Sequence, residues 1–363
     1  MTGTELEEYL NGGIENIVAT VLRSTAKNPR ESMFLIKFAT SEKKAHRLRA
    51  EQESNGTHIP PFLIASITNK CNLHCTGCYA RANNSCSDEP ARKPLDGGVW
   101  GRIFREAAEM GISFVLLAGG EPFVRRDVLE QAAATKNILF PIFTNGTMID
   151  DGCLDLLDKN RNLAPIISIE GGRELTDARR GDGVFEAVEN AMERLNKKGI
   201  LFGFSVTVTK ENMADVLSDS FAEKAVACGC KAVIFVEYVP VDSATARLAP
   251  DDGDRAYMAS RLDILRSRCS DLLMISFPGD EKATGGCLAA GRGFFHIGAY
   301  GQAEPCPFSP YSDTNLADVP LKEALNSPLF RKLTESGALF ESHDGGCVLF
   351  GKAEEVSALL KKD

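Results

Sequence analysis

The sequence lacks any stretch suited to a membrane span or to export. Its 363 residues contain no apolar run of membrane-spanning length, and its first residues lack the basic and apolar regions of a signal peptide. Basic residues are also outnumbered by acidic ones. The resulting net charge of −9 argues against a broad nucleic-acid-binding face. We therefore expect a cytoplasmic protein whose partners include neither a membrane nor a nucleic acid.

A disulfide framework is missing as well. The chain has eleven cysteines, but reducing conditions in a cytoplasm oppose disulfide bonds. Three cysteines lie close together near residue 75, and three more lie in a Gly-rich C-terminal region. Metal or iron–sulfur chemistry explains these two groups better. They are Cys71, Cys75 and Cys78, and Cys287, Cys306 and Cys347.

Between residues 61 and 245, apolar runs alternate with helical patterns. The runs are rich in β-branched residues, as buried parallel strands are. Six such units predict an α/β fold, namely a partial (β/α)6 barrel of parallel strands, with an open doubly wound sheet as the alternative. The expected strands are 62–68, 113–118, 138–143, 165–170, 202–208 and 232–238.

The regions on either side of this barrel have different sequence patterns. Residues 1–60 are polar with helical periodicity, which predicts a helical cap on the barrel rather than a docking arm. Residues 246–363 predict a small domain with a β-hairpin followed by a helix. Its expected elements are a helix at 254–268, a strand at 272–277, a hairpin at 293–307 and a helix at 321–333.

The loop after the first expected strand carries the strongest chemical signal. Cys71, Cys75 and Cys78 offer three thiolates from one short segment. Three thiolates leave one iron of a [4Fe–4S] cluster open, and that iron can chelate a small molecule. A zinc site completed by His74 or Cys86 is one alternative, and three unliganded buried cysteines are another.

Unusual residues also follow the other strands, at the edge where α/β proteins place their sites. Gly119-Gly120-Glu121-Pro122 follows the second strand, and Asn145 follows the third. Glycines let the backbone approach a ligand closely, and Glu121 can add a charge-assisted hydrogen bond to an ammonium group. Ser168 and Glu170 close the fourth strand and point the same way.

The three-cysteine loop, followed by the aromatic Tyr79, resembles the cluster loop of the radical S-adenosylmethionine (radical SAM) enzymes. In that family the open iron of a [4Fe–4S] cluster takes the amino and carboxylate groups of SAM. The segment 119–122 resembles the family's GGEP motif, which contacts the SAM amino group. The resemblance thus implies a SAM site built by Gly119, Gly120 and Glu121.

Further SAM contacts follow from the same resemblance. Ser168 and Glu170 are expected at the ribose hydroxyls, although the family often carries Asp where this chain has Glu170. Arg180, or its neighbour Arg179, is expected at the SAM carboxylate. Tyr79 is expected to cover the adenine or to pack beside the cluster. Asn145, Ser205 and Thr207 complete the list of possible polar contacts.

A second cysteine pattern lies in the C-terminal region. Cys287 is followed after thirteen residues by Gly301 and after four more by Cys306. This spacing resembles the opening of the SPASM extension, whose hairpin-and-helix core is called the twitch subdomain and holds auxiliary iron–sulfur clusters. The dense cysteine block of the full pattern is absent here, and only Cys347 follows.

We therefore expect one auxiliary [4Fe–4S] cluster on Cys287, Cys306 and Cys347. His343, Asp344 or the distant Cys269 are candidates for a fourth ligand. Without such a ligand this iron is open and can bind substrate, which resembles the GTP-cyclising enzyme of molybdenum-cofactor synthesis. A zinc site or inert cysteines are the alternative.

The resemblance implies reductive cleavage of SAM to a 5′-deoxyadenosyl radical, which abstracts a hydrogen atom from a substrate. It also implies an electron donor such as flavodoxin or ferredoxin. We expect the substrate to be a peptide or protein that is matured by cross-linking or oxidation. A radical step in small-molecule or cofactor biosynthesis is the alternative, and a non-catalytic iron–sulfur or zinc protein is the second. No residue is required as acid, base or nucleophile.

Overall fold

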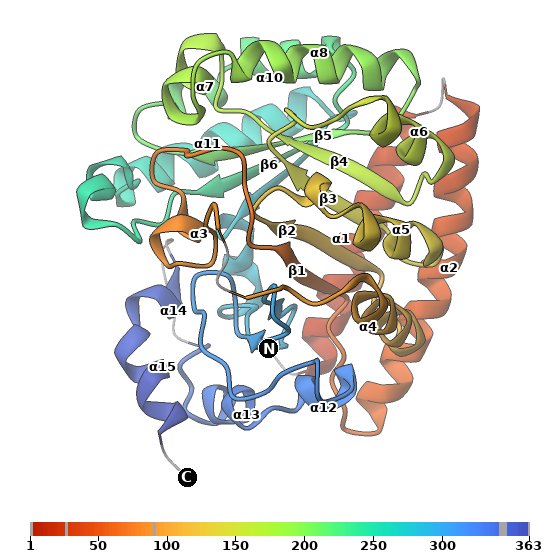
Figure 1. The fold of residues 1–363 in the computed structure, drawn as a ribbon, viewed down its shortest axis with the longest axis vertical. Helices are drawn as coiled ribbons and strands as arrows, with labels where there is room; N and C mark the ends of the chain where they lie inside the picture. The colour runs from red at the N-terminus through yellow and green to blue at the C-terminus, as the bar shows by residue number, and fades with distance from the viewer. Residues whose placement is uncertain (1–2, 26–27, 90–91, 341–346, 362–363) are drawn as a thin grey trace.

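The computed structural model describes residues 3–25, 28–89, 92–340 and 347–361. A nine-stranded sheet in the order β7-β6-β5-β4-β3-β2-β1-β8-β9 forms its centre (Figure 1). All neighbouring strands are parallel except β8 and β9, which form an antiparallel pair. The strands are β1 (Phe62–Thr68), β2 (Phe114–Gly119), β3 (Phe140–Thr144), β4 (Leu163–Ser168), β5 (Gly203–Val208), β6 (Ala232–Glu237), β7 (Leu273–Phe277), β8 (His296–Ile297) and β9 (Ala303–Glu304).

This architecture confirms the expected partial barrel of parallel strands. The six strands expected from the sequence are β1 to β6, with ends shifted by at most two residues. One difference concerns β7, which we assigned to the C-terminal domain. It pairs in parallel with β6 and extends the barrel sheet. The reason is that α11 (Asp252–Arg268) crosses over between β6 and β7 like the preceding helices.

Helices connect the strands and end where the sequence indicates. Helix α4 (Gly97–Met110) begins after Asp96, whose carboxylate accepts from the Val99 N–H, and ends before Gly111, whose φ of +88° suits glycine. The other connecting elements are α3 (Tyr79–Ala82), η1 (Pro122–Val124), α5 (Arg126–Ala134), α6 (Asp151–Lys159), α7 (Arg173–Arg180), α8 (Val184–Lys197), α9 (Met213–Val216), α10 (Asp219–Ala227) and η2 (Ser243–Leu248).

Side chains alternate between the two faces of each strand, and the two faces have different surroundings. One face is buried against the connecting helices, as Leu63 on β1 and Phe235 on β6 illustrate. The other face lines the inside of the barrel. Phe114 and Ala164, near the starts of β2 and β4, pack there against Ile14 and Phe38 of the N-terminal helices.

The N-terminal helices α1 (Gly3–Ser24) and α2 (Pro29–Ser54) run side by side along the sheet (Figure 1). Their contacts with the first residues of the strands close the N-terminal end of the barrel. The expected helical cap is therefore present. Among the described residues, none of the helices combines the length and apolar character needed to cross a membrane.

The C-terminal region forms the expected hairpin, because β8 and β9 pair and β8 joins the edge of the sheet beside β1. The prediction of a single helix at 321–333 is wrong. This segment is two helices, because Ser327 caps a new helix that begins at Pro328. The elements of this region are η3 (Gly279–Thr284), α12 (Leu321–Leu325), α13 (Pro328–Glu335), α14 (Val348–Gly351) and α15 (Ala353–Leu360).

One buried arginine joins the cap to the barrel, and its removal tests this packing. Arg49 is 1% exposed, and donates to Glu42 at 2.9 Å and to the Gly111 carbonyl at 2.6 Å. The substitution Arg49→Met leaves the buried Glu42 carboxylate unpaired. We expect the free energy of unfolding to fall by about 3–5 kcal/mol in denaturant titrations.

The exposed pair of Arg247 and Glu211 supplies the control. Arg247→Ala should change the unfolding free energy by less than about 1 kcal/mol. Equal effects of the two substitutions would contradict a structural role for Arg49.

Candidate functional site

The loop between β1 and α3 carries Cys71, Cys75 and Cys78 at the C-terminal end of the first strand. Arg81 on α3 turns back over this loop and donates to the Leu73 carbonyl at 2.8 and 3.0 Å. It also donates to the Cys71 carbonyl at 3.3 Å. These bonds fix the loop backbone and place a guanidinium beside the thiols.

The surroundings of the three thiols differ. A hydrogen bond from the Cys86 thiol lowers the pKa of Cys71 to about 6, and Arg81 adds to the effect. Burial raises the pKa of Cys75, although the charges of Arg180 and Arg179 oppose this. A thiolate is the form that binds iron. The lowered pKa of Cys71 favours its thiolate form, and its role as an iron ligand remains a prediction.

The two residues proposed to complete a zinc site differ in position. His74 is exposed and bonds to Asp88 at 3.0 Å. Cys86 does lie beside Cys71. Within the described part of the chain, however, no three His, Cys, Asp or Glu side chains gather closely enough to hold a single metal ion. The zinc interpretation thus gains no support from this geometry.

Gly119 and Gly120 lie against the backbone that leads into the cysteine loop. The Gly120 N–H donates to the Thr68 carbonyl at 2.8 Å, and the Glu121 N–H donates to the Lys70 carbonyl at 2.9 Å. A Cβ at Gly119 would overlap the Thr68 carbonyl oxygen, and one at Gly120 would overlap the Lys70 carbonyl oxygen. The glycines therefore allow the two loops to meet.

Glu121 is 1% exposed and joins the ends of β2 and β3. Its carboxylate accepts from the Thr144 hydroxyl at 2.8 Å and from the backbone N–H groups of Asn145 at 2.8 Å and Phe123 at 3.1 Å. Burial raises its pKa to about 7, while these three donors oppose the shift. The structure gives Glu121 a positioning role, and its contact to an ammonium group remains a prediction.

Asn145 ties the loop after β3 to the cysteine loop. Its amide donates to the Asn72 side chain at 2.8 Å, and its carbonyl oxygen accepts from Thr147. The Asn72 amide in turn donates to the Thr147 hydroxyl at 2.9 Å. Asn145 therefore joins the two loops through side-chain hydrogen bonds, and its expected contact with SAM is untested.

Glu170 and two arginines form a buried charge cluster. Glu170 is 1% exposed and accepts from both Arg179 and Arg180, the latter at 2.9 Å from its Nε. The Arg179 carbonyl accepts from the Thr76 N–H at 2.8 Å, which links this cluster to the cysteine loop. Glu170 thus anchors the two arginines beside Cys75. The expected contacts to the SAM ribose and carboxylate remain predictions.

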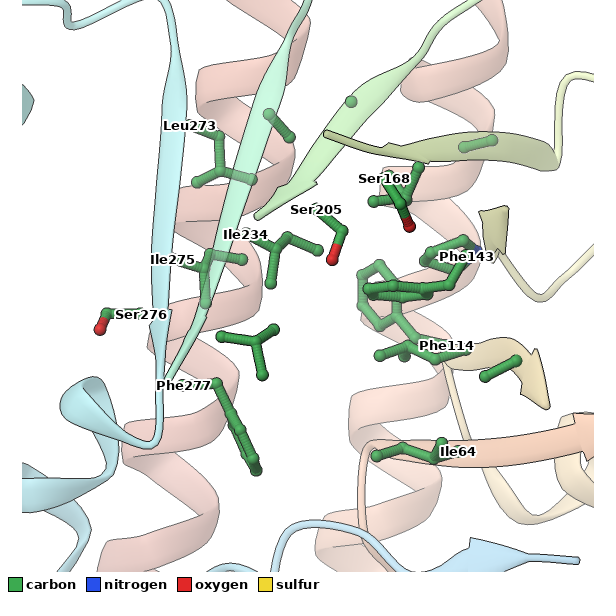
Figure 2. A pocket seen from close by; sticks show the side chains of 18 of the residues that line it. Ile64, Phe114, Phe143, Ser168, Ser205, Ile234, Leu273, Ile275, Ser276 and Phe277 are labelled. Atoms are coloured by element: carbon green, nitrogen blue, oxygen red, sulfur yellow. The ribbon is translucent and has the colours of Figure 1, made fainter. Parts of the chain in front are cut away.

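A cavity of about 1190 Å³ runs from the cysteine loop into the barrel. The three loop cysteines, Gly119, Gly120, Glu121, Arg179 and Arg180 all line it. Figure 2 shows Ser168 and Ser205 among apolar side chains such as Phe143, Ile234 and Ile275. Most SAM-site candidates therefore face one shared space with largely apolar walls.

Tyr79 connects the first cysteine group with the second. Its ring packs on Phe308, with ring centroids 4.9 Å apart. Burial and the nearby Cys78 raise the pKa of its hydroxyl, and the charge of Cys306 adds to this increase. Asn83 on the same side donates to the Pro307 carbonyl at 3.3 Å. Tyr79 therefore packs between the cysteine loop and the segment after the hairpin, and its expected contact with the adenine or the cluster remains a prediction.

The cysteines of the second group interact with one another, although, as at the first loop, no three His, Cys, Asp or Glu side chains of the described residues gather closely enough there to hold a single metal ion. The free thiols of Cys306 and Cys347 share a hydrogen bond, which lowers the pKa of Cys347 and raises that of Cys306. Cys287 is buried, and its charge interacts with that of Cys347. Two segments far apart in the sequence, 287–306 and the start of α14, are thereby joined.

The candidates for a fourth ligand do not join this group. Cys269 lies before β7, whereas η3 and Cys287 lie after it, so the length of the strand, about 17 Å, separates them. His343 and Asp344 lie outside the described residues. His296 bonds to Ser66 and Glu304, each at 2.7 Å, and so links β8 to β1 and β9.

One residue of this site was missed in the sequence. Arg81 holds the cysteine loop, and the sequence has no spacing signal for it. Tyr238, a polar candidate from the sequence without an assigned role, covers the loop, because a Cβ on Gly77 would overlap the Tyr238 hydroxyl. These features define a partial-barrel α/β protein with a candidate iron–sulfur site at the C-terminal ends of its strands.

Comparison with known proteins identifies the family of this barrel. Residues 65–219 match the model of the Radical SAM superfamily. The chain therefore contains a radical SAM domain, which confirms the resemblance of the cysteine loop. This superfamily of enzymes uses a [4Fe–4S] cluster and SAM. The SPASM or twitch assignment of the C-terminal region remains a prediction.

Similar proteins carry out different reactions. Fe-coproporphyrin III synthase of Methanosarcina barkeri is 33% identical over 43% of this chain, but the match spans only 39% of that relative. AdoMet-dependent heme synthase of the same organism is 26% identical over 77% of this chain and 86% of its own length. Mycofactocin maturase MftC of Mycobacterium tuberculosis is 28% identical, and the match covers 82% and 81% of the two chains.

A solved structure shares the fold. SuiB of Streptococcus suis, bound to S-adenosylmethionine, has a TM-score of 0.67 at 18% identity. The match covers 85% of this chain and 78% of SuiB. This similarity supports the arrangement of strands and helices described above.

The cysteine loop fits a [4Fe–4S] cluster. Its three thiols are partly exposed, line the cavity and lie beside three guanidinium groups, on Arg81, Arg179 and Arg180. These positive charges suit an anionic, thiolate-ligated cluster. Cys71, Cys75 and Cys78 are thus the residues that would hold it, although their role as ligands is a prediction.

The close approach at Gly120 gives a direct test of the site. Gly120→Ala places a methyl group against the Lys70 carbonyl and the Cys71 N–H. We expect the free energy of unfolding to drop by about 1–3 kcal/mol because of overpacking. We also expect weaker SAM binding in equilibrium dialysis of the reconstituted protein, because Cys71 must shift.

Gly12→Ala is the matched control, because Gly12 lies in helix α1 with no atom near the added methyl. This variant should be more stable by about 0.5–1 kcal/mol and should bind SAM normally. Normal SAM binding by Gly120→Ala would show that the two loops need not meet closely.

Proposed function

We propose that the protein reductively cleaves SAM and uses the resulting radical to abstract a hydrogen atom from a substrate in the barrel cavity. The [4Fe–4S] cluster and SAM, when bound, supply the electron and the 5′-deoxyadenosyl radical. One observation supports this most. The three-cysteine loop, the Gly119–Gly120 segment and the Arg179–Arg180 pair face a single cavity.

The chain's own residues have distinct tasks in this proposal. Cys71, Cys75 and Cys78 bind the iron ions, and Arg81 holds their loop in shape. Arg180 lies beside Cys75, where it can meet the SAM carboxylate. Ser168 points into the cavity at the end of β4, where it can bind the ribose (Figure 2). The apolar inner wall excludes water from the radical.

We further propose one auxiliary [4Fe–4S] cluster on Cys287, Cys306 and Cys347. The three thiols lie together, and Tyr79 and Phe308 bridge from their hairpin to the first loop. A cluster there lies close to the cavity, because Phe308 also lines it. This position suits electron exchange with the substrate. An electron donor such as flavodoxin or ferredoxin would supply electrons to the cluster on the first cysteine loop.

We favour a peptide or protein as the substrate. The match to a maturase covers most of both chains. SuiB, which shares this fold, has been solved with its precursor peptide SuiA, so the fold can admit a peptide.

A tetrapyrrole is the second candidate. The two synthases among the relatives are named for Fe-coproporphyrin III and heme. The cavity of about 1190 Å³ has mostly apolar walls, as a large planar ligand would require.

Removal of one cysteine tests the proposed SAM cleavage. We expect the anaerobically reconstituted Cys75→Ala protein to form no 5′-deoxyadenosine from SAM and dithionite, because the cluster loses one of its three ligands. Cys228→Ala is the control, since the Cys228 thiol donates a hydrogen bond to the Ala225 carbonyl in the preceding turn of the chain and is not among the described residues that line the cavity. Product formation by Cys75→Ala would overturn the proposal, and the assay is chromatography of the quenched reaction.

Deuterium transfer separates the two substrate classes. A deuterated candidate precursor peptide should label 5′-deoxyadenosine if the peptide is the substrate. If instead only an iron coproporphyrin shifts its absorbance on binding and increases 5′-deoxyadenosine formation, the tetrapyrrole alternative holds. Mass spectrometry of the nucleoside measures the label.

A further inference from the structure

We propose that the Glu281 carboxylate is the fourth protein ligand of the auxiliary cluster held by Cys287, Cys306 and Cys347. This inference rests on the auxiliary cluster of the proposed function. It concerns a residue with no recognisable motif, which lies in the segment between β7 and the hairpin.

Glu281 is a buried carboxylate, and one of its oxygens lacks a hydrogen-bond partner. It lies in η3, directly after β7, and is 5% exposed. One of its oxygens, Oε1, is buried without a hydrogen-bond partner. The carboxylate accepts a backbone hydrogen bond from Leu288. An unsatisfied buried carboxylate is costly, and such a group in a native site calls for a missing ion or water.

The carboxylate lies among the three cysteines. The charge of Glu281 interacts with those of Cys347 and Cys287, and the Cys347 thiol is hydrogen-bonded to the Cys306 thiol. Four groups that carry negative charge when ionised thus interact with one another, and three of them are buried while Cys347 is half-buried. A set of three thiolates and one carboxylate matches the four irons of a cubane cluster, one ligand for each iron.

Positive charge near this group is limited. Arg292 donates to the carbonyls of Cys287 at 2.6 Å and Thr284 at 3.1 Å, and its guanidinium stacks on Phe340. Its hydrogen bonds therefore go to backbone oxygens rather than to the Glu281 carboxylate. Iron ions bound between the thiolates and the carboxylate would supply the compensating charge.

Other candidates near the group are engaged or distant. Glu237 also lies near Cys347, but Arg255 donates to it at 2.7 and 2.9 Å. Cys269 is at the opposite end of β7. Asp280, the neighbour of Glu281, pairs with Arg266 at 2.7 and 2.9 Å. Glu281 is the carboxylate that combines burial, proximity and an unpartnered oxygen.

An oxygen ligand gives the fourth iron a distinctive property. Iron–sulfur clusters are normally held by thiolates, and a carboxylate is a harder ligand that binds this iron less tightly. Loss of that ligand should therefore leave the fourth iron open, and mild oxidation should then release it as a ferrous ion and leave a three-iron cluster. Such a change is visible by electron paramagnetic resonance, independently of any enzyme activity.

The test uses the full chain with Cys71, Cys75 and Cys78 all changed to Ala, so that only the auxiliary cluster remains. We expect this parent to hold about four irons after anaerobic reconstitution. After mild oxidation with ferricyanide, which accepts one electron, the variant with Glu281→Gln added should lose one ferrous ion, hold about three irons and give the signal of an oxidised three-iron cluster, whereas the parent should keep about four irons. Adding Glu281→Cys should restore about four irons, with a changed spectrum of the reduced cluster. Asp280→Asn is the matched control and should behave like the parent.

Each outcome decides a stated claim. A Glu281→Gln protein with the iron content and spectrum of the parent overturns Glu281 as a ligand while the auxiliary cluster stands. A parent without iron overturns the auxiliary cluster and this inference with it. If Glu281→Gln fails to fold by circular dichroism, Glu281→Cys decides: an altered reduced spectrum supports the ligand, and an unchanged one overturns it.

Discussion

The close contact between two backbone segments is the constraint on which the site depends. The loop after β2 meets the strand end just before Cys71, and only glycine at positions 119 and 120 leaves room for this. Glu121 then fastens the same loop to Thr144 and Asn145 at the end of β3. Through these contacts the barrel scaffold fixes the loop that presents the three cysteines.

The two cysteine groups belong to one continuous structure. The hairpin of β8 and β9 extends the barrel sheet beside β1, the strand that carries the first cysteine loop. His296 holds this junction through Ser66 and Glu304. Tyr79 and Phe308 then fill the space between the loops. A C-terminal cluster would therefore be held rigidly with respect to SAM, as controlled electron exchange requires.

Much of the fold could be predicted from sequence because its signals are local. The apolar runs gave β1 to β6, and the spacing of Cys71, Cys75 and Cys78 singled out the first site. Long-range contacts could not be predicted in this way. The pairing of β7 with β6, the bond from Cys86 to Cys71 and the arginine pair on Glu170 depend on how loops pack. Glu281 belongs to this class, since only packing brings it beside the cysteines.

Coordination of SAM by the cluster on the first loop is the central claim. The most direct measurement is electron–nuclear double resonance on the dithionite-reduced protein with SAM that carries ¹⁵N in its amino group. The account predicts a ¹⁵N coupling to the cluster and a change in its paramagnetic signal when SAM is added. A reduced cluster whose paramagnetic signal does not change when SAM is added, and which shows no ¹⁵N coupling, would contradict this claim.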